Sequence, residues 1–213
     1  MKKMKRNILM LMAGILAVAI TGGEVKAQSG TVKLNLYYNY GLPTGSFKSD
    51  VISNGSPRGG GADILYNIDP TWAAGLSVAF QDFYQKYPRA VYNTGKNEQI
   101  SAVLSNSVQS TPILAKVVFN PLGRQRSVVQ PYVSAGVGFS MISDKQYLGQ
   151  FESSDASVAF ASQIGAGVQV PFGKLSNSGL LLGANYNLVP YSKNDLSNLN
   201  SIDFRVGVYL PLR

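Results

Sequence analysis

Five charged residues of this chain lie in segments where every second residue is apolar, and all five occupy the alternate, polar positions: Lys33, Asp63, Lys116, Asp203 and Arg205. If one sheet carries these positions, the five side chains point to the same side of it. Two carboxylates in that arrangement could act as a general acid and a general base. The three cations beside them favour a different interpretation, because a buried charge is very costly to desolvate unless it is paired. We therefore expect a structural network of salt bridges and no catalytic pair.

The composition removes the commonest catalytic groups. The chain has no histidine and no cysteine, so neither a Ser-His nor a Cys-His nucleophile can form, and the commonest ligands of transition metals are missing. Two glycine-containing strings, at 136–141 and 165–170, are incomplete forms of a dinucleotide fingerprint and open no helix. We expect no enzymatic activity, no metal site and no cofactor.

The N-terminal residues predict export. Residues 1–7 contain four basic residues, residues 8–20 form an apolar or small run, and residues 25–27 offer small side chains where signal peptidase cleaves. The run is shorter than the roughly 20 residues that a spanning helix needs. We expect a cleaved signal peptide at 1–27 and one mature domain at 28–213.

The net charge of +8 comes partly from this N-terminal segment. Removing residues 1–27 takes away five of the 19 basic and one of the 11 acidic residues, which leaves 14 and 10 and a net charge of +4. No basic stripe remains, so the sequence does not support nucleic-acid binding.

Eight segments of the mature chain alternate with a period of two, which is typical of β-strands. They span residues 31–40, 60–68, 72–81, 113–120, 128–141, 160–172, 180–188 and 201–213. No comparable stretch has helical periodicity. The chain is therefore expected to be all-β.

The connections between these segments alternate in length. Three are short and rich in glycine, proline, asparagine and serine: 69–71, 121–127 and 173–178. Four are longer: 41–59, 82–109, 143–157 and 189–201. Short turns at one end and long loops at the other are the layout of transmembrane β-barrels. The pattern predicts an eight-stranded antiparallel up-and-down transmembrane β-barrel.

The polarity of the two faces predicts which one points outward. One face collects Leu, Val, Ile, Ala and Phe, whereas the other is rich in Gly, Ser, Asn and Gln and carries the five charges. An outer face with so few charges would not keep an exported barrel soluble, but small side chains and paired charges suit a narrow lumen. In the last segment we expect Phe204, Val206 and their alternate neighbours to face lipid, and Asp203 and Arg205 to face inward. Aromatic residues near segment ends match the girdles of a membrane barrel: Tyr38, Tyr40, Tyr66, Trp72, Phe119 and Phe172.

Three stretches of the sequence carry a resemblance to a known family. They are PYVSAGVGFS at 131–140, QIGAGVQVPFG at 163–173 and FRVGVYLPL at 204–212. Together with the signal peptide, they resemble the small outer-membrane β-barrels of the OmpA/OmpX type, in the outer membrane protein β-barrel domain group. The resemblance implies an integral protein of the cell outer membrane of a Gram-negative bacterium. It also implies contacts with outer-membrane lipid and lipopolysaccharide, and insertion by the barrel-insertion machinery.

The interior of an eight-stranded barrel is just wide enough for its own side chains to fill, so we expect any activity to reside in the long loops. The longest loop interleaves aromatic and basic residues that could contact lipopolysaccharide phosphates, an extracellular glycan or a partner protein. The candidates are Tyr84, Lys86, Tyr87, Arg89, Tyr92 and Lys96. Alternatively, the first aromatic residues of this loop extend the preceding strand, and the cations are ordinary solvated charges.

The sequence thus predicts an integral outer-membrane barrel with a narrow, salt-bridged lumen and a structural or loop-mediated binding or adhesion role. Two alternatives stay open: a small-solute channel whose ion pairs open transiently, and an accessory subunit of an outer-membrane complex. A soluble exported calyx of the lipocalin kind fits less well, because it would need a charged outer face.

Overall fold

The computed structural model describes most of the mature chain. The described ranges are residues 30–88, 90–93, 99–102, 104–123, 128–148, 151–173, 177–193 and 196–212. The expected signal peptide at 1–27 lies outside the described residues.

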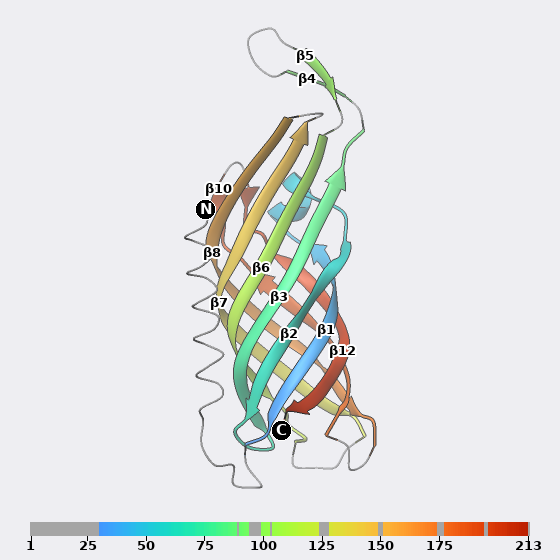
Figure 1. Cartoon of the computed structure of the whole chain (residues 1–213), viewed down its shortest axis with the longest axis vertical. Coiled ribbons are helices and arrows are strands. Elements are labelled where there is room, and N and C mark those ends of the chain that lie inside the picture. The colour runs from blue at the N-terminus through green and yellow to red at the C-terminus, as the bar shows by residue number, and fades with distance from the viewer. Residues whose placement is uncertain are drawn as a thin grey trace.

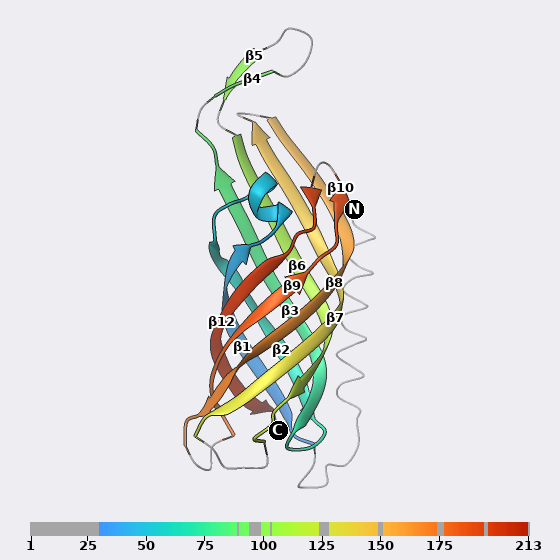
Figure 2. The same cartoon turned by 180° about the vertical axis from the view of Figure 1, so that it is seen from behind.

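Eight antiparallel strands close into a barrel (Figure 1, Figure 2). They are β1 (Val32–Pro43), β2 (Ser56–Asn67), β3 (Trp72–Lys86), β6 (Leu104–Phe119), β7 (Gln130–Leu148), β8 (Phe151–Pro171), β9 (Gly179–Leu188) and β12 (Ser201–Leu212). Each strand pairs with the next one along the chain, and β1 closes the cylinder on β12. The closing ladder runs without interruption from Val32 opposite Leu212 to Pro43 opposite Ser201. These pairings confirm the expected eight-stranded antiparallel up-and-down barrel.

The two ends of the barrel differ. At one end, here called the turn end, the connections are short, β1 begins and β12 ends (Figure 1). The other end, the loop end, carries the longer connections, and Figure 2 shows a small helical turn in its mouth. Five short elements belong to these connections: η1 (Phe47–Val51), a π-helical turn, and two hairpins formed by β4 (Ala90–Asn93) with β5 (Gln99–Ala102) and by β10 (Ser192–Lys193) with β11 (Leu196–Ser197).

Among the described residues, no helix is long and apolar enough to cross a membrane.

Several strands continue at the loop end beyond the alternating segments. β3 and β6 pair as far as Lys86 opposite Ser105, so much of the expected loop at 82–109 is paired strand. β7 and β8 pair along their whole length, which replaces the expected loop at 143–157 by a hairpin. Side chains there no longer alternate between apolar and polar, so the alternation could not predict these extensions. The strands continue because the backbone N–H and C=O groups still require partners.

The last strand shows which face points outward. Phe204 and Val206 are 50% and 49% exposed, whereas Asp203 and Arg205 are each 4% exposed. The same alternation runs around the barrel, so that large apolar side chains cover its outside and polar side chains its inside. The expected orientation of the two faces is confirmed.

Aromatic residues gather on the outward surface toward both ends. At the turn end, Trp72 and Phe119 lie opposite each other on β3 and β6, with their ring centroids 4.7 Å apart. Toward the loop end the exposed aromatic residues include Tyr38, Tyr40, Phe80, Phe139, Phe160 and Phe204. Two such belts are typical of membrane barrels, where they lie at the level of the lipid headgroups.

Replacing Val206 by lysine should prevent stable insertion of the barrel. Val206 faces outward in β12, and a lysine facing the bilayer midplane of a barrel costs about 2–4 kcal/mol. Insertion is measured by the mobility shift between unboiled and boiled samples of isolated outer membranes. Val206→Ile is the matched control and should insert like the wild type. Normal insertion of Val206→Lys would contradict a lipid-facing position for this residue.

Candidate functional site

One ion pair is buried in the barrel interior. Lys116 on β6 and Asp63 on β2 reach over the intervening strand β3, and Lys116 Nζ lies 2.8 Å from Asp63 Oδ2. The residues opposite Lys116 on both neighbouring strands are glycines, which leaves room for its side chain. Tyr37 donates its hydroxyl proton to Asp63 Oδ1 at 2.9 Å, and Asn35 Nδ2 donates to Oδ2 at 3.4 Å. The two charges are therefore buried, paired and surrounded by further donors.

The other two charges of the central interior are held by neutral groups. Arg205 stacks on Tyr37, with 4.3 Å between the guanidinium carbon and the ring centroid. When the Asn185 amide is turned so that its oxygen faces Arg205, Oδ1 accepts from Nε at 2.5 Å and from Nη1 at 3.1 Å. Asp203 accepts hydrogen bonds from Asn187 Nδ2 at 2.6 Å and from the Ser201 hydroxyl at 3.2 Å. Hydrogen bonds to the charged forms offset the cost of burying both groups.

The five charged residues of the expected network have different immediate partners. Among the described residues, two of the five form an ion pair closer than 4.0 Å. Lys33 lies toward the turn end, with Nζ 5.5 Å from the centroid of the Tyr209 ring. Asp63 and Asp203 have different hydrogen-bond partners, so the geometry does not assemble an acid–base pair. That all five charges act as one network stays a prediction.

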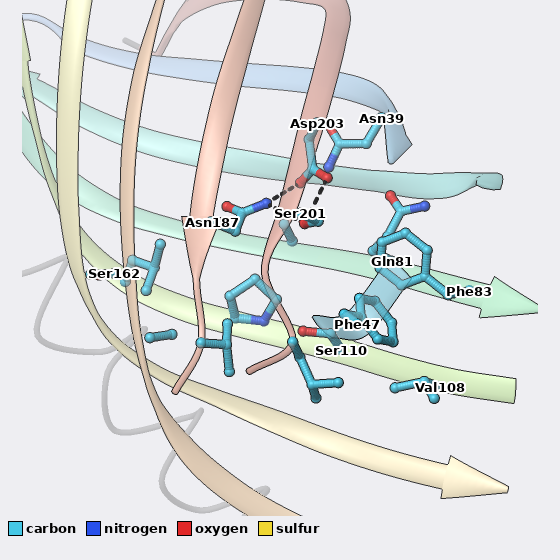
Figure 3. Close-up of a pocket in the computed structure, with 16 residues that line it drawn as sticks. Asn39, Phe47, Gln81, Phe83, Val108, Ser110, Ser162, Asn187, Ser201 and Asp203 are labelled. Carbon is cyan, nitrogen blue, oxygen red and sulfur yellow. Dashed lines mark hydrogen bonds between the residues drawn. The ribbon is translucent and has the colours of Figure 1, made fainter. Parts of the chain in front are cut away.

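A hydrophobic plug closes the interior at the loop end. Phe47, at the start of η1, is 1% exposed, and its ring meets the ring of Phe83 edge-on at 5.1 Å (Figure 3). The plug consists of buried side chains from two long connections and from the strands around them: Phe47, Val51, Ile52, Phe83, Val108, Leu114, Ile142, Ala161, Val189 and Leu199. Burial of this apolar surface holds the β1–β2 and β9–β12 connections inside the mouth of the barrel.

Sequence reasoning treated the β1–β2 connection as an external loop and missed the plug. The available signal was the presence of three large apolar residues, Phe47, Val51 and Ile52, in a segment expected to be solvated. A loop of that composition needs an apolar surface against which to pack. Tyr87, which directly follows β3, also holds its backbone: its hydroxyl donates to the Val51 carbonyl oxygen at 2.8 Å.

A small cavity separates the plug from the polar interior (Figure 3). Its volume is about 20 Å³, which is room for about one water molecule. Asn39, Gln81 and Asp203 line its polar side. Gln81 fits there because a Cβ atom at Gly41 or Gly59 would collide with its amide. A space of this size does not pass hydrated ions or larger solutes.

A wider hollow of about 370 Å³ opens at the turn end. Its lining is largely polar and includes Lys33, Asn67, Asn120 and Tyr209. Apolar and aromatic side chains fill the interior in this half of the barrel: Leu65, Ala73, Val118, Tyr132, Leu181 and Tyr209. The hollow is therefore a vestibule that narrows into a packed interior.

The structure describes the side chains of three of the six candidate loop residues, and these three have different surroundings. Tyr84 and Lys86 are exposed on the outward face of β3, whereas the Tyr87 hydroxyl binds the Val51 carbonyl and so supports the plug. The others lie outside the described residues: Arg89, Lys96 and the side chain of Tyr92.

Arg58 on β2 is a rim residue that sequence reasoning missed. Its guanidinium carbon lies 5.2 Å from the centroid of the Tyr84 ring, and its Nη1 lies 3.5 Å from Asp82 Oδ2. Its side chain is nevertheless 60% exposed. The signal was present, because Arg58 has the same phase as the outward residues Ile64 and Tyr66 of the same strand.

Two acidic side chains lie opposite each other near the loop end. Asp144 on β7 pairs in the ladder with Asp155 on β8. Partial burial, and then the charge of Asp155, raise the pKa of Asp144 above the usual value for an aspartate. Among the described residues, no group of three or more histidine, cysteine or acidic residues could hold a metal ion. Like charges directly opposite each other destabilise a sheet.

Comparison with known proteins identifies the family. The model of the family described as "Outer membrane protein beta-barrel domain" matches residues 13–209. The chain belongs to this family. The match confirms the expected resemblance to small outer-membrane β-barrels. No curated protein matches the sequence.

Two solved structures of outer-membrane barrels share the fold. Neisserial surface protein A (NspA) aligns with a TM-score of 0.51 at 14% sequence identity, covering 88% of this chain and 100% of that one. A major outer membrane protein from Thermus thermophilus aligns with a TM-score of 0.54 at 14% identity, covering 85% and 99%. At these identities the likeness concerns the fold alone, and it agrees with the closed barrel.

Replacing Lys116 by methionine should destabilise the folded barrel by about 3–5 kcal/mol, because it leaves the Asp63 carboxylate buried without its cation. The double variant Lys116→Met/Asp63→Leu removes both charges and should recover much of that loss. The midpoint of urea unfolding in lipid vesicles, followed by the loss of the unboiled gel band, measures both effects. Lys86→Met removes an exposed cation and serves as the control. Wild-type stability of Lys116→Met, or a double variant as unstable as the single one, would contradict the importance of the pair.

Proposed function

We propose that this member of the outer membrane β-barrel family is an integral protein of the outer membrane of a Gram-negative bacterium, with a closed, salt-bridged lumen and a binding role at its loop end. The family match and the apolar outward surface support this location. The buried pair of Lys116 and Asp63 supports the salt-bridged lumen. The absence of histidine and cysteine, and the separate partners of Asp63 and Asp203, support a role without enzymatic activity.

The plug is the observation that carries the proposal. A solute arriving from the loop end would meet the plug, then a cavity of about 20 Å³, and then the buried ion pair. Because the plug and the ion-pair layer both close the interior, we place the binding activity on the outer surfaces of the barrel. At the loop end these surfaces are built on paired strands, which hold binding residues more precisely than a flexible loop does.

The proposed partners follow from the surfaces. The apolar band would contact outer-membrane lipid and lipopolysaccharide after insertion by the barrel-insertion machinery. The exposed rim residues Arg58, Tyr84 and Lys86 would supply contacts to an extracellular glycan or protein, since cations beside an aromatic ring suit anionic and sugar-bearing ligands.

A small-solute channel is the second candidate function. The polar hollow of about 370 Å³ at the turn end favours it. A path from this hollow to the loop end would require both the ion pair to open and the plug to leave the mouth. Simultaneous loss of a buried pair and of a hydrophobic cluster is costly, so the closed barrel is the better-supported state.

Folded protein in planar lipid bilayers should show no steady single-channel current. The variant Phe47→Ala/Leu199→Ala loosens the plug but keeps the Lys116–Asp63 pair, so it should also remain silent. A steady, salt-dependent current through the wild type would overturn the closed lumen and establish the channel. Current through the variant alone would show that the plug, and not the ion pair, is the barrier.

A further inference from the structure

The hollow at the turn end is a blind pocket. Its floor is the packed cluster of the lower interior, in which Leu65, Tyr132 and Tyr209 are at most 5% exposed. The hollow is therefore closed toward the buried ion pair and open at the turn end. Its volume of about 370 Å³ lies within the range of small-molecule binding sites, roughly 300–1,000 Å³. A pocket of this form can retain a ligand of that size.

One cation lines this pocket without a carboxylate partner. Lys33 is an inward residue of β1 at the wall of the hollow. Within the described part of the chain, no carboxylate lies within 4.0 Å of its Nζ atom. The ring of Tyr209, with its centroid 5.5 Å from Nζ, supports the ammonium group from the floor. Lys116 is neutralised by Asp63, whereas Lys33 can bind an anion that enters from the turn end.

The surroundings of Lys33 favour an anionic ligand over a cationic one. Asp69, in the β2–β3 turn, also lines the hollow, but its Oδ1 atom accepts from the backbone N–H groups of Thr71 and Trp72 at 2.6 and 2.8 Å. These bonds hold the carboxylate against its own turn. The other two short connections, 121–127 and 173–178, contain three basic residues and no acidic one. A net positive charge around the entrance attracts anions.

Two side-chain amides stand on other walls of the pocket. Asn67, the last residue of β2, donates from Nδ2 to Thr31 Oγ1 at 2.8 Å. Asn120, directly after β6, is 8% exposed, and its backbone N–H donates to the Thr71 carbonyl oxygen at 2.7 Å. The Oδ1 atom of Asn120 has no hydrogen-bond partner in the described part of the chain. Because the terminal torsion of asparagine is soft, this amide can turn its oxygen toward a ligand N–H.

We propose that the turn-end hollow binds the carboxyl terminus of a short peptide. Lys33 Nζ would donate a charge-assisted hydrogen bond to the carboxylate. The amides of Asn67 and Asn120 match peptide N–H and C=O groups, because an amide both donates and accepts. A hollow of this volume holds many water molecules, so an organic ligand fills it better than a single inorganic anion.

The floor of the pocket favours a peptide over a carboxylated sugar. Leu65, Ala73 and Val118 would contact an apolar side chain of the last ligand residue. Sugar hydroxyls would lose their hydrogen bonds to water there without gaining partners. The short turns of an outer-membrane barrel face the periplasm, so the ligand would be a periplasmic peptide. That placement rests on the proposed location, whereas binding itself does not depend on the proposed role of the loop end.

The test compares two ligands that differ in one charge. Ligand-observed NMR on the folded, full-length mature protein in detergent measures binding of N-acetyl-alanyl-alanine and of the same dipeptide with its carboxyl group amidated. The wild type should bind the acid at least tenfold more tightly than the amide. Lys33→Gln should abolish this preference and leave binding of the amide unchanged. Asn120→Ala should weaken binding of both forms and keep the preference for the acid.

Lys86→Gln is the matched control, because Lys86 is an exposed cation at the loop end. It should keep the wild-type preference, and every variant should keep the heat-dependent mobility shift of a folded barrel. Equal binding of acid and amide by the wild type, or an undiminished preference in Lys33→Gln, would overturn the inference. Binding of acetate or glucuronate as tight as that of the dipeptide acid would overturn the assignment to a peptide. An inserted barrel that binds neither dipeptide would overturn this inference alone, whereas failure to insert would overturn the proposed function.

Discussion

The rest of the structure depends on the closure of the sheet between β1 and β12. In the hydrocarbon layer of a membrane no water is available to backbone N–H and C=O groups, so a strand there needs a neighbour on both sides. The uninterrupted ladder between the first and last strands supplies that neighbour where an open sheet would have two edges. Once the sheet is closed, alternation assigns each strand residue to the outside or the inside. The outward position of Phe204 and Val206 and the inward position of Asp203 and Arg205 follow from this single constraint.

Closure also fixes a narrow interior, and this determines where function can reside. Charges that alternation directs inward must be satisfied there, as Lys116 is by Asp63 and Arg205 by Asn185 and Tyr37. Space left above them is filled by side chains of the long connections. The result is a polar layer beneath an apolar plug: pairing and hydrogen bonds offset the cost of burying the polar layer, and burial of apolar surface stabilises the plug. Exposed, oriented polar groups are then found on the rim, where the strands rise beyond the apolar band.

The sequence predicted those features that a period of two encodes, namely the eight strands, their antiparallel order and the orientation of both faces. Arg58 was missed because it precedes the segment expected at 60–68, and its position beside Tyr84 depends on the register between strands. It could not predict the plug, because loop residues such as Phe47 obey no period and their burial depends on surfaces far away in the chain. Nor could it predict that Asp63 and Asp203 have different partners, since pairing across the lumen depends on register and tilt. The strand extensions at 82–109 and 143–157 were missed because the alternation ends at the border of the apolar band.

Contact between the apolar face and lipid can be tested without any substitution, because the chain has one tryptophan. Trp72 is 44% exposed on the outward surface at the turn end of β3. The decisive measurement is quenching of its fluorescence in vesicles made with brominated lipids, beside quenching by a water-soluble ion. A lipid-facing Trp72 should be quenched strongly by bromines near the headgroup end of the acyl chains, more weakly by bromines at mid-chain, and little from the aqueous phase. Efficient aqueous quenching with no effect of brominated lipid would place this face in water and contradict the account.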